Sequence, residues 1–405
     1  MSGSQLISVT ELNALLSDPK LVLLDVRYSL TDAAYGRAAY AEGHIPGARF
    51  ADLKTDVAGV CSGSNGRTPL PDSGRFCVNM RRLGLNPDSN VVVYDDGESN
   101  FAARLWFTLR WVGFANVRVL NGGLCAWKAA GLALQVEEPE WEAGTYRATM
   151  PLERVFDDDF VERNLELRDY TLVDARAHNR YTGEVENHDP KAGHIPGSLN
   201  RPSGDNLLPN KCFKDTETLR REFETVFNGV PHADIINSCG SGVTACCNHL
   251  AMMEAGIPAA GVYIGSWSEW VSDDNRPIKT GDDAVIFATG ILVDAAIKAA
   301  GILSAEGIDV SVVNVHTVKP LDEKTVLEFA ARTRLCITAE EHTIIGGLGS
   351  AVAEVLCEKL PTPLVRVGIE DKFGKSGKAA ELLDYYGLNA AGIAAAVRRG
   401  LALKK

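Results

Sequence analysis

The sequence predicts an α/β fold with two tandem copies of one α/β domain, followed by a third α/β domain of a different kind. Two observations indicate the duplication. Residues 21–50 and 170–200 each contain an apolar strand pattern that ends in Asp-x-Arg and is followed by Gly-His-Ile-Pro-Gly. Residues 91–127 align without a gap to residues 234–270. The third observation is the alternation of strand and helix patterns after residue 283, which predicts the last domain.

The ungapped alignment predicts a strand, a helix and a second strand in each copy, and it keeps four residue pairs at one spacing. The pairs are Gly97 with Gly240, Gly113 with Gly256, Gly122 with Gly265, and Trp127 with Trp270, each 143 residues apart (240 − 97 = 143). We expect residues 1–136 to form the first copy and residues 151–275 the second copy. Linkers are expected at residues 137–150 and 276–282, with the third domain at 283–405.

The elements of the third domain follow in the same alternating order. The pattern predicts strands in AVIFATG, DVSVVNVHTV and LCITAEEH, and helices in LVDAAIKAAGILSAEG and EKTVLEFAART. A last helix is expected to begin at the glycine-rich stretch GGLGS. We interpret this stretch as a helix start packed closely on its sheet rather than as a phosphate-binding loop.

Composition excludes several classes of function. The chain has 405 residues, of which 45% are hydrophobic, enough for two or three globular domains with real cores. Its formal net charge of −12 provides no basic field for nucleic acid or an anionic membrane. The N-terminus shows no leader pattern and no run of about eighteen apolar residues occurs, so we expect a cytoplasmic protein. Nine scattered cysteines match neither a disulfide framework nor paired metal-binding spacing, which indicates free thiols.

Cys239 differs from the other cysteines in its setting. It follows an apolar strand pattern and precedes Gly-Ser-Gly-Val-Thr and a predicted helix, and Asp96 holds its position in the first copy. A core position would have kept an apolar or small residue in both copies, so we expect an accessible loop at the carboxyl end of a strand, where ligands bind in such folds. Most cysteines are small buried hydrophobes. That interpretation fits Cys125, Cys246, Cys336 and Cys357, whereas Cys239 is the candidate nucleophile.

The residues after Cys239 favour an anion. A small, flexible stretch turns backbone N–H groups toward one point, and the helix that follows adds the positive end of its dipole. Such donors favour the thiolate of Cys239 and, after reaction, a persulfide, whose outer sulfur also carries negative charge. Ser241 is expected to offer its hydroxyl to a developing oxyanion. The backbone expected to bind substrate is that of Gly240, Gly242, Val243 and Thr244.

Three features resemble the two-domain sulfurtransferases of the rhodanese superfamily, over roughly residues 5–275. They are tandem domains with GHIPG in each, a candidate catalytic cysteine in only the second, and the loop CGSGVTA. The loop is most similar to that of 3-mercaptopyruvate sulfurtransferases, since thiosulfate sulfurtransferases typically carry basic residues after the cysteine. Thiosulfate is a dianion that would profit from cations, and Cys239 to Ala245 contains none. The resemblance implies an enzyme that moves sulfane sulfur from 3-mercaptopyruvate through a Cys239 persulfide to a thiol, thioredoxin or cyanide. Pyruvate is released, and no metal or organic cofactor is needed.

The resemblance also implies substrate-binding residues. Arg180, in NRYTG, corresponds to the arginine that holds the substrate carboxylate, a task for which a planar guanidinium is suited. The alternative is a surface arginine paired with Glu184 or Glu186. The second arginine usual before GHIPG is absent from EVENHDPKA, and His188 or Lys191 is expected to replace it.

In the first copy, the resemblance implies a proton network rather than a second nucleophile. The histidine of HIPG, His44, would join Ser241, with Asp32 as its acidic partner. The alternative is a hydrogen-bonded structural histidine, as we expect for His194 in the second copy. Arg67, in NGRTPLP, resembles the link segment of the family and is left out of the predicted catalytic set.

After residue 283 the sequence resembles a different family. VVNVHTVKPLD, ITAEEHTIIGGLGSAVAEVL and DKFGKSGKAAELLDYYGL are similar to the C-terminal domain of transketolases and related thiamine-diphosphate enzymes. In that family the cofactor site lies in two other domains, both absent here, so thiamine-dependent ketol transfer lacks its residues and no cofactor is expected. We expect residues 283–405 to form a homodimer contact or to dock another protein.

Two alternatives to the mercaptopyruvate reaction stay open. One is a thiosulfate:cyanide sulfurtransferase, against which the uncharged loop argues. The other is a persulfide carrier or assembly scaffold, in which Cys239 relays sulfur to a partner docked on the C-terminal domain.

Overall fold

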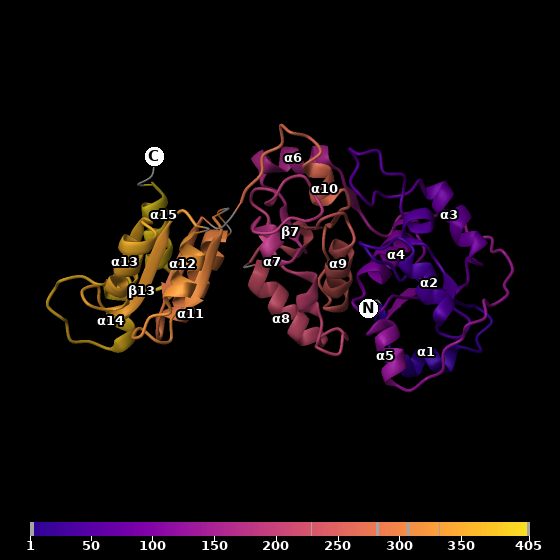
Figure 1. The fold of residues 1–405 in the computed structure, drawn as a ribbon, viewed down its shortest axis with the longest axis horizontal. Helices are drawn as coiled ribbons and strands as arrows, with labels where there is room; N and C mark the ends of the chain where they lie inside the picture. The colour runs from indigo at the N-terminus through magenta and orange to yellow at the C-terminus, as the bar shows by residue number, and fades with distance from the viewer. Residues whose placement is uncertain are drawn as a thin grey trace. The chain divides into compact units, whose positions relative to one another are not determined.

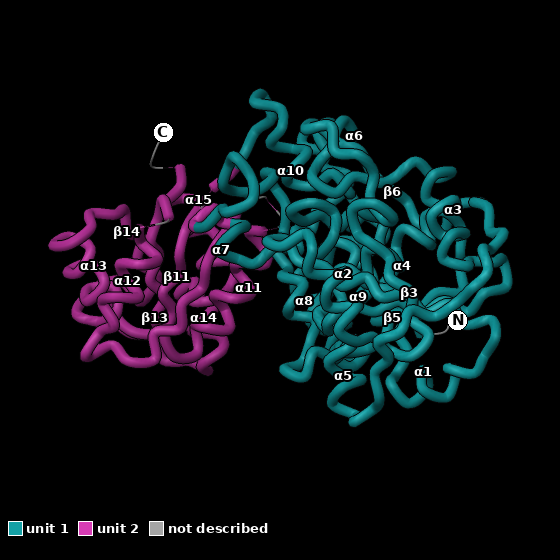
Figure 2. The backbone as a smooth tube through the Cα atoms, turned by 45° about the vertical axis from the view of Figure 1, so that its right-hand side comes forward, with its two compact units in different colours: residues 1–181, 185–278 teal, residues 182–184, 279–405 magenta. Residues whose placement is uncertain are grey.

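The computed structural model describes residues 4–227, 229–280, 283–304, 306, 308–331 and 333–402. It divides into two compact units (Figure 2). Unit 1 comprises Met1–Tyr181 and Val185–Ile278, and unit 2 comprises Thr182–Glu184 and Lys279–Lys405. Unit 1 contains two five-stranded sheets and unit 2 a four-stranded sheet, and the strands that pair in them run parallel. The predicted α/β class is confirmed.

The two sheets of unit 1 have the same strand order, which confirms the predicted duplication. The first sheet has the order β1-β5-β4-β2-β3 and the second has the order β6-β10-β9-β7-β8, so each strand has a counterpart five numbers later. The first set is β1 (Leu6–Ile7), β2 (Leu21–Asp25), β3 (Arg49–Phe50), β4 (Asn90–Tyr94) and β5 (Val117–Leu120). The second is β6 (Val155–Phe156), β7 (Thr171–Asp174), β8 (Leu199–Asn200), β9 (Ile235–Ser238) and β10 (Gly261–Tyr263).

Helices cover both sheets and also join them. Those of the first copy are α1 (Val9–Leu15), α2 (Tyr35–Glu42), α3 (Ser73–Arg82), α4 (Asn100–Trp111) and α5 (Gly123–Ala129), with a π-helical turn η1 (Leu53–Val57). Those of the second are α6 (Asp158–Leu167), α7 (His178–Tyr181), α8 (Thr216–Phe227), α9 (Thr244–Glu254) and α10 (Ser266–Trp270), with 3-10 turns η2 (Ser203–Asn206) and η3 (His232–Asp234).

Helices α4 and α9 form the seam between the two copies. They pack on one another (Figure 1), and one apolar core continues across them from the first sheet to the second. Both helices are buried around most of their circumference, from Ala102 to Leu109 in α4 and from Ala245 to Met252 in α9. A helix that is buried on nearly every side belongs to the interior of a core. The seam brings segments of the first copy to the loop that precedes α9.

The repeated Asp-x-Arg has the same structural task in each copy. Arg27 binds the Asp25 carboxylate through Nε at 2.9 Å and Nη2 at 2.7 Å, and it donates to Gly43 O at 2.9 Å. Arg176 repeats these bonds to Asp174 at 2.9 and 2.7 Å and to the Gly193 carbonyl at 2.8 Å. Each pair therefore fixes the segment before the HIPG turn against the end of a central strand.

Unit 2 has one sheet of order β12-β11-β13-β14 with apolar clusters on its two faces. Its strands are β11 (Ala284–Ala288), β12 (Val310–Asn314), β13 (Cys336–Thr343) and β14 (Leu364–Ile369). Its helices are α11 (Leu292–Ser304), α12 (Glu323–Ala331), α13 (Leu348–Lys359), α14 (Ala379–Tyr385) and α15 (Ala390–Ala402). Across the described part of the chain, none of the helices has the length and apolar character needed to cross a bilayer.

The glycine-rich stretch of unit 2 is a helix start packed on its sheet, as predicted. A Cβ on Gly349 would lie 2.9 Å from Thr338 Oγ1, so only glycine permits this approach to β13. The first N–H groups of α13 are satisfied internally, because Leu348 and Gly349 donate to the Glu340 carboxylate at 2.7 and 2.8 Å. That carboxylate holds the position that a bound phosphate would otherwise take.

Candidate active site

Cys239 lies at the carboxyl end of β9, in the loop that leads into α9. Its Sγ accepts a hydrogen bond from the N–H of Gly242 at 3.1 Å, and its own N–H donates to Ser266 Oγ at 3.0 Å. The Ser266 hydroxyl also lies 3.9 Å from Sγ. The loop thus directs donors at the sulfur, as the sequence predicts for an anion. The side chains of Val243 and Ser241 are buried, and Thr244 begins the helix.

The predicted exposure of this loop is wrong. Cys239 is only 2% exposed, because the start of α10 covers it. The N–H of Trp267 donates to Cys239 O at 2.9 Å, and the N–H of Ser268 donates to Gly240 O at 2.9 Å. A buried sulfur is screened less from the charges around it, so the arrangement of those charges decides its chemistry.

Gly242 is required by the geometry of the loop. Its φ is +71°, in the left-handed region, and a Cβ there would lie 2.3 Å from the carbonyl oxygen of Ile264. Any larger residue would push the loop away from β10. The Gly242 N–H, which bonds the sulfur, would move with it.

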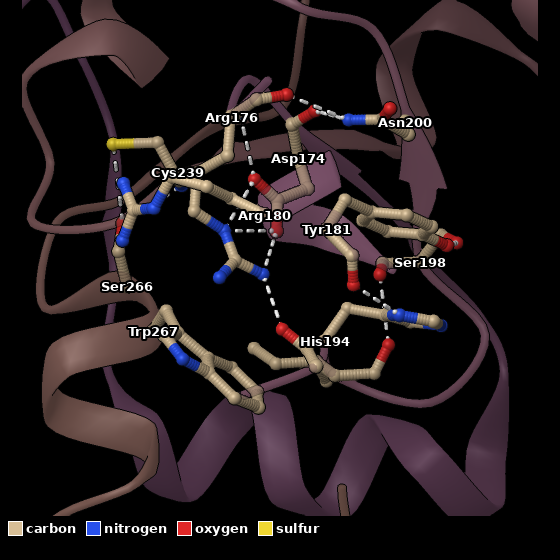
Figure 3. Close-up of polar contacts among 12 residues, drawn as sticks. Asp174, Arg176, Arg180, Tyr181, His194, Ser198, Asn200, Cys239, Ser266 and Trp267 are labelled. Carbon is tan, nitrogen blue, oxygen red and sulfur yellow. Dashed lines mark hydrogen bonds and ion pairs between the residues drawn. The ribbon is translucent and has the colours of Figure 1, made fainter. Parts of the chain in front are cut away.

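Three arginines surround Gly240, next to the nucleophile. A Cβ built on Gly240 would lie 3.2 Å from Arg67 Nη2, 3.4 Å from Arg180 Nη1 and 3.7 Å from Arg176 Cδ. Figure 3 shows the two arginines of the second copy near Cys239. The loop from Cys239 to Ala245 contains no cation, as its sequence shows. The cations come from other segments of the chain.

Two carboxylates alternate with these arginines. Glu186 Oε1 lies 2.7 Å from Arg180 Nη2, and Glu186 Oε2 lies 3.6 Å from Arg176 Nη1. Asp189 pairs with Arg180 at 3.3 Å and also contacts the guanidinium of Arg67. We call these five residues the arginine–carboxylate cluster. These five residues carry a formal charge of +1 when ionised, and Asp174, which pairs with Arg176 at 2.7 Å, offsets it.

The cluster contains an electrostatic strain that an anion would relieve. Burial and the nearby Arg180 lower the pKa of Arg67, although the carboxylate of Glu186 and the sulfur of Cys239 oppose this. The Arg176 guanidinium lies over the indole ring of Trp267, 4.8 Å from the ring centroid. Two buried nitrogens, Arg180 Nε and Arg176 Nη1, have no hydrogen-bond partner among the described residues. The cluster therefore has N–H donors that a bound anion could satisfy.

The structure gives His188 and Lys191 other roles than the predicted replacement of an arginine. His188 is exposed, and its carbonyl accepts from Arg67 Nη1 at 3.4 Å. Partial burial and the charges of Arg180 and Arg67 lower the pKa of His188, which disfavours its cationic form. Lys191 Nζ pairs with Asp274 at 2.8 Å. The second arginine beside the loop is Arg67, from the first copy.

The predicted network of His44, Asp32 and Ser241 is not formed. His44 is fully buried, with Nδ1 2.9 Å from Tyr40 O and its ring stacked on Tyr40 at 3.9 Å. Its Nε2 has no hydrogen-bond partner in the described part of the chain. Asp32 is exposed and accepts from the N–H of Ala34 at 2.9 Å.

The second copy contains an equivalent packing of a histidine on a tyrosine. His194 stacks on Tyr181 at 3.8 Å, with Nδ1 2.8 Å from the Tyr181 carbonyl (Figure 3). A contact that recurs in both copies serves the shared fold rather than the reaction of one copy. The alternative interpretation of His44, a structural histidine, is the one that the structure supports.

Arg67 was not among the predicted site residues, although its segment was noted in the sequence. A Cβ on Gly66 would lie 2.8 Å from Gly265 O, and the N–H of Arg67 donates to Ser268 Oγ at 3.0 Å. The segment therefore docks on the start of α10 in the second copy. Its only signal in the sequence was the glycine- and proline-rich NGRTPLP itself.

Comparison with known proteins agrees with this architecture. The Rhodanese-like domain family matches residues 8–130 and 157–273, and the Transketolase, C-terminal domain family matches residues 275–393. A probable 3-mercaptopyruvate sulfurtransferase of Pseudomonas aeruginosa is 45% identical over 284 residues, which are 70% of this chain and 100% of that protein. A putative thiosulfate sulfurtransferase, SseB of Mycobacterium tuberculosis, is 37% identical over 69% of this chain and 98% of its own.

The solved structures show the same likeness. The crystal structure of SseA from Escherichia coli, described as a 3-mercaptopyruvate sulfotransferase of the rhodanese fold, matches with a TM-score of 0.58 and 32% identity. The match covers 65% of this chain and 99% of that one. The chain therefore belongs to the rhodanese family, as a tandem-domain member that carries a transketolase C-terminal domain after its two rhodanese-like domains.

Proposed function

We propose that this protein is a sulfurtransferase that takes sulfane sulfur from 3-mercaptopyruvate onto Cys239 and passes it to a thiol. The observation that carries the proposal is the coincidence of two features at one loop. The Gly242 N–H donates to Cys239 Sγ at 3.1 Å, and three arginine side chains surround the adjacent Gly240. Relatives named as 3-mercaptopyruvate sulfurtransferases support the same assignment.

The reaction has two half-reactions. The Cys239 thiolate attacks the sulfur of 3-mercaptopyruvate, and the carbon–sulfur bond breaks. The electron pair of that bond leaves with pyruvate as its enolate, which takes a proton. The enzyme then holds a persulfide, and an acceptor thiolate attacks the outer sulfur and releases the Cys239 thiolate.

The arginine–carboxylate cluster supplies the site for the substrate carboxylate. Arg180 and Arg67 each present a guanidinium beside Gly240, and bidentate contacts of this kind orient a planar 2-keto acid. Arg176 is already held by Asp174 at 2.7 Å, so Arg180 and Arg67 are the guanidinium groups that remain for a substrate anion. Their paired donors suit a planar carboxylate, and this geometry, rather than an uncharged loop, is our reason to prefer mercaptopyruvate.

The test compares wild-type protein with Cys239→Ser, and uses Cys125→Ser as a matched control because Cys125 is an exposed cysteine of the first copy. Pyruvate and sulfide release are measured with 3-mercaptopyruvate or thiosulfate as donor and excess thiol as acceptor. We expect Cys239→Ser to lose at least about a thousandfold in rate and Cys125→Ser to keep the rate. Faster turnover of thiosulfate, or activity that survives in Cys239→Ser, would contradict the proposal.

For the acceptor and the setting we propose the finer assignments made from the sequence. The acceptor is a small thiol or a thioredoxin-like protein in the cytoplasm, and residues 283–405 form a contact between two copies of the chain. Support for the contact comes from apolar side chains that unit 2 leaves exposed, among them Ile345 at 57% and Phe373 at 101%. Sedimentation of the full chain and of Phe373→Ser tests it. The variant should shift toward monomer, and a monomeric wild type would contradict the assignment.

We also propose the domain limits inferred from the sequence, which are 1–136, 151–275 and 283–405. The division of the structure into units after Ile278 supports the last of these limits.

A further inference from the structure

Arg104, on α4 of the first copy, is a buried guanidinium without a counter-ion. The residue is 0% exposed, and among the described residues its side-chain hydrogen bonds go to two backbone carbonyls rather than to a carboxylate. Its Nε has no hydrogen-bond partner in the described chain. Burial lowers the pKa of Arg104, while the sulfurs of Cys246 and Cys239 act in the opposite direction. An uncompensated buried charge is costly, so its presence calls for a reason.

The two hydrogen bonds of Arg104 join the halves of the active site. Nη1 donates to the carbonyl of Gly242 at 2.9 Å, and Nη2 donates to the carbonyl of Pro69 at 3.1 Å. Gly242 is the residue whose N–H bonds the nucleophilic sulfur. Pro69 lies two residues after Arg67, in the segment NGRTPLP. One side chain therefore ties the catalytic loop to the segment that brings in the second arginine.

The repeat shows that this arginine does not serve the shared fold. The position of Arg104 in the second copy is held by Cys247 (104 + 143 = 247), which is also fully buried. A requirement of the common helix would have placed similar residues at both positions. The charge occurs only in the copy without the nucleophile, and it points across the seam toward the copy that has one.

We propose that Arg104 is a positioning residue for the reaction of Cys239. It fixes the position of the catalytic loop relative to the segment that carries Arg67. Its fixed positive charge also interacts across the buried loop with the sulfur of Cys239. Arg104 touches neither the substrate nor the sulfur and acts through Gly242 and Pro69. The inference rests on the proposed function in one respect, the assignment of Cys239 as the nucleophile.

The test measures the reactivity of Cys239 by alkylation and, separately, the turnover of the same variants. The rate at which iodoacetamide alkylates Cys239 is followed by peptide mass spectrometry over a range of pH, in wild type, Arg104→Lys and Arg104→Met. Arg104→Met removes the charge and should raise the pH midpoint of alkylation by about one unit. Arg104→Lys keeps the charge but not both hydrogen bonds, so its midpoint should stay near wild type while kcat falls about tenfold.

A surface variant and a fold check make the result decisive. Arg37→Met removes an arginine that is 60% exposed on the first copy, and it should leave the midpoint unchanged. If Arg104→Met does not fold, as judged by thermal unfolding, Arg104→Gln replaces it, since it is polar but uncharged. A midpoint in the folded uncharged variant equal to that of wild type would overturn the proposal. Failure of the proposed function would appear elsewhere, as sulfur transfer that persists in Cys239→Ser.

Discussion

The loops after β4 and β9 turn an equivalent backbone N–H toward different side chains. In the first copy, the carboxylate of Asp95 accepts four backbone N–H groups. The donors are Gly97 at 2.9 Å, Ser99 at 3.0 Å, Phe101 at 3.0 Å and Ala102 at 3.2 Å. In the second copy, the counterpart of Ser99 is Gly242, whose N–H donates to the Cys239 sulfur instead. The anion-binding loop is thus a property of the repeated backbone, and the side chain placed in it decides whether the copy reacts.

One substitution accounts for the difference. The counterpart of Asp95 is Ser238, a short neutral residue that leaves the loop donors to the sulfur of the next residue. Unit 2 uses the same solution as the first copy, since Glu340 satisfies the N–H groups at the start of α13. An internal carboxylate closes a potential anion site in both places.

The largest effect is expected from Gly242→Ala. The added Cβ would meet the carbonyl oxygen of Ile264 at 2.3 Å, so the loop must shift and the sulfur loses its N–H donor. We expect kcat/KM to fall by about a hundredfold to a thousandfold. Steady-state kinetics with 3-mercaptopyruvate measure this. Ser99→Ala, at the equivalent position of the first copy, is the control, because that residue already has a Cβ at φ +57°. Equal losses of kcat/KM in both variants would contradict the role assigned to the Gly242 N–H.

The next effect is one of stability. Asp95→Asn replaces a carboxylate with an amide, which offers one acceptor oxygen to four donors and turns an NH₂ group toward the others. We expect the free energy of unfolding of unit 1 to fall by about 2–3 kcal/mol. Tryptophan fluorescence in urea follows this unit alone, since all six tryptophans lie at or before residue 270. Asp96→Asn should cost far less, and a cost as large as that of Asp95→Asn would contradict the role assigned to Asp95.

Donor selectivity gives a smaller, sharper test of the site. Asp189→Asn removes one negative charge from the arginine–carboxylate cluster and raises its formal charge from +1 to +2. The ratio of kcat/KM for thiosulfate to kcat/KM for 3-mercaptopyruvate should rise about tenfold. Asp274→Asn, which removes a 93% exposed carboxylate near Lys191, is the matched control and should leave the ratio unchanged. An unchanged ratio in Asp189→Asn would show that charge balance does not select the donor.

The smallest effect concerns pH. Burial, together with the nearby Asp158, raises the pKa of Glu269 in α10 from its ordinary value of 4.5 to about 7, whereas the first copy has Ala126 at this position. The folded state keeps a proton that the unfolded chain releases, so the contribution of Glu269 to stability is fully present below about pH 4.5 and is lost as the pH rises through about 7. Glu269→Gln should remove this slope.

We expect Glu269→Gln to stabilise unit 1 by about 1 kcal/mol above pH 7, after allowance for the partial exposure of the carboxyl group. Urea unfolding at acidic and alkaline pH measures the difference. A wild-type chain whose Glu269-dependent stability increases with pH would contradict the sign.

The fold was predictable because the sequence contains two copies of the same domain. The ungapped alignment and the paired GHIPG turns predicted two equal sheets, and the structure confirms them in strand order. The candidate nucleophile was predictable for the same reason, since Cys239 aligns with the charged Asp96 of the first copy. Local sequence also identified the glycine-rich start of α13 correctly.

The remainder of the site depends on contacts between distant segments. Arg67 and Arg104 reach Gly240 and Gly242 from the other copy, across more than a hundred residues of sequence. Neither periodicity nor motif spacing carries that information. The burial of Cys239 and the structural role of His44 were mispredicted for a related reason. Both depend on which side chain packs above a loop, and sequence order does not give this.

The seam between α4 and α9 changes how the site depends on concentration. If the two copies were separate proteins, the arginines of one would reach the loop of the other only when the pair associated, and dilution would dismantle the site. On one chain the encounter is intramolecular, with an effective concentration set by the connecting segment. The copy that has no nucleophile thus acts as a permanently bound partner, retained because half of the positive charge around the sulfur belongs to it.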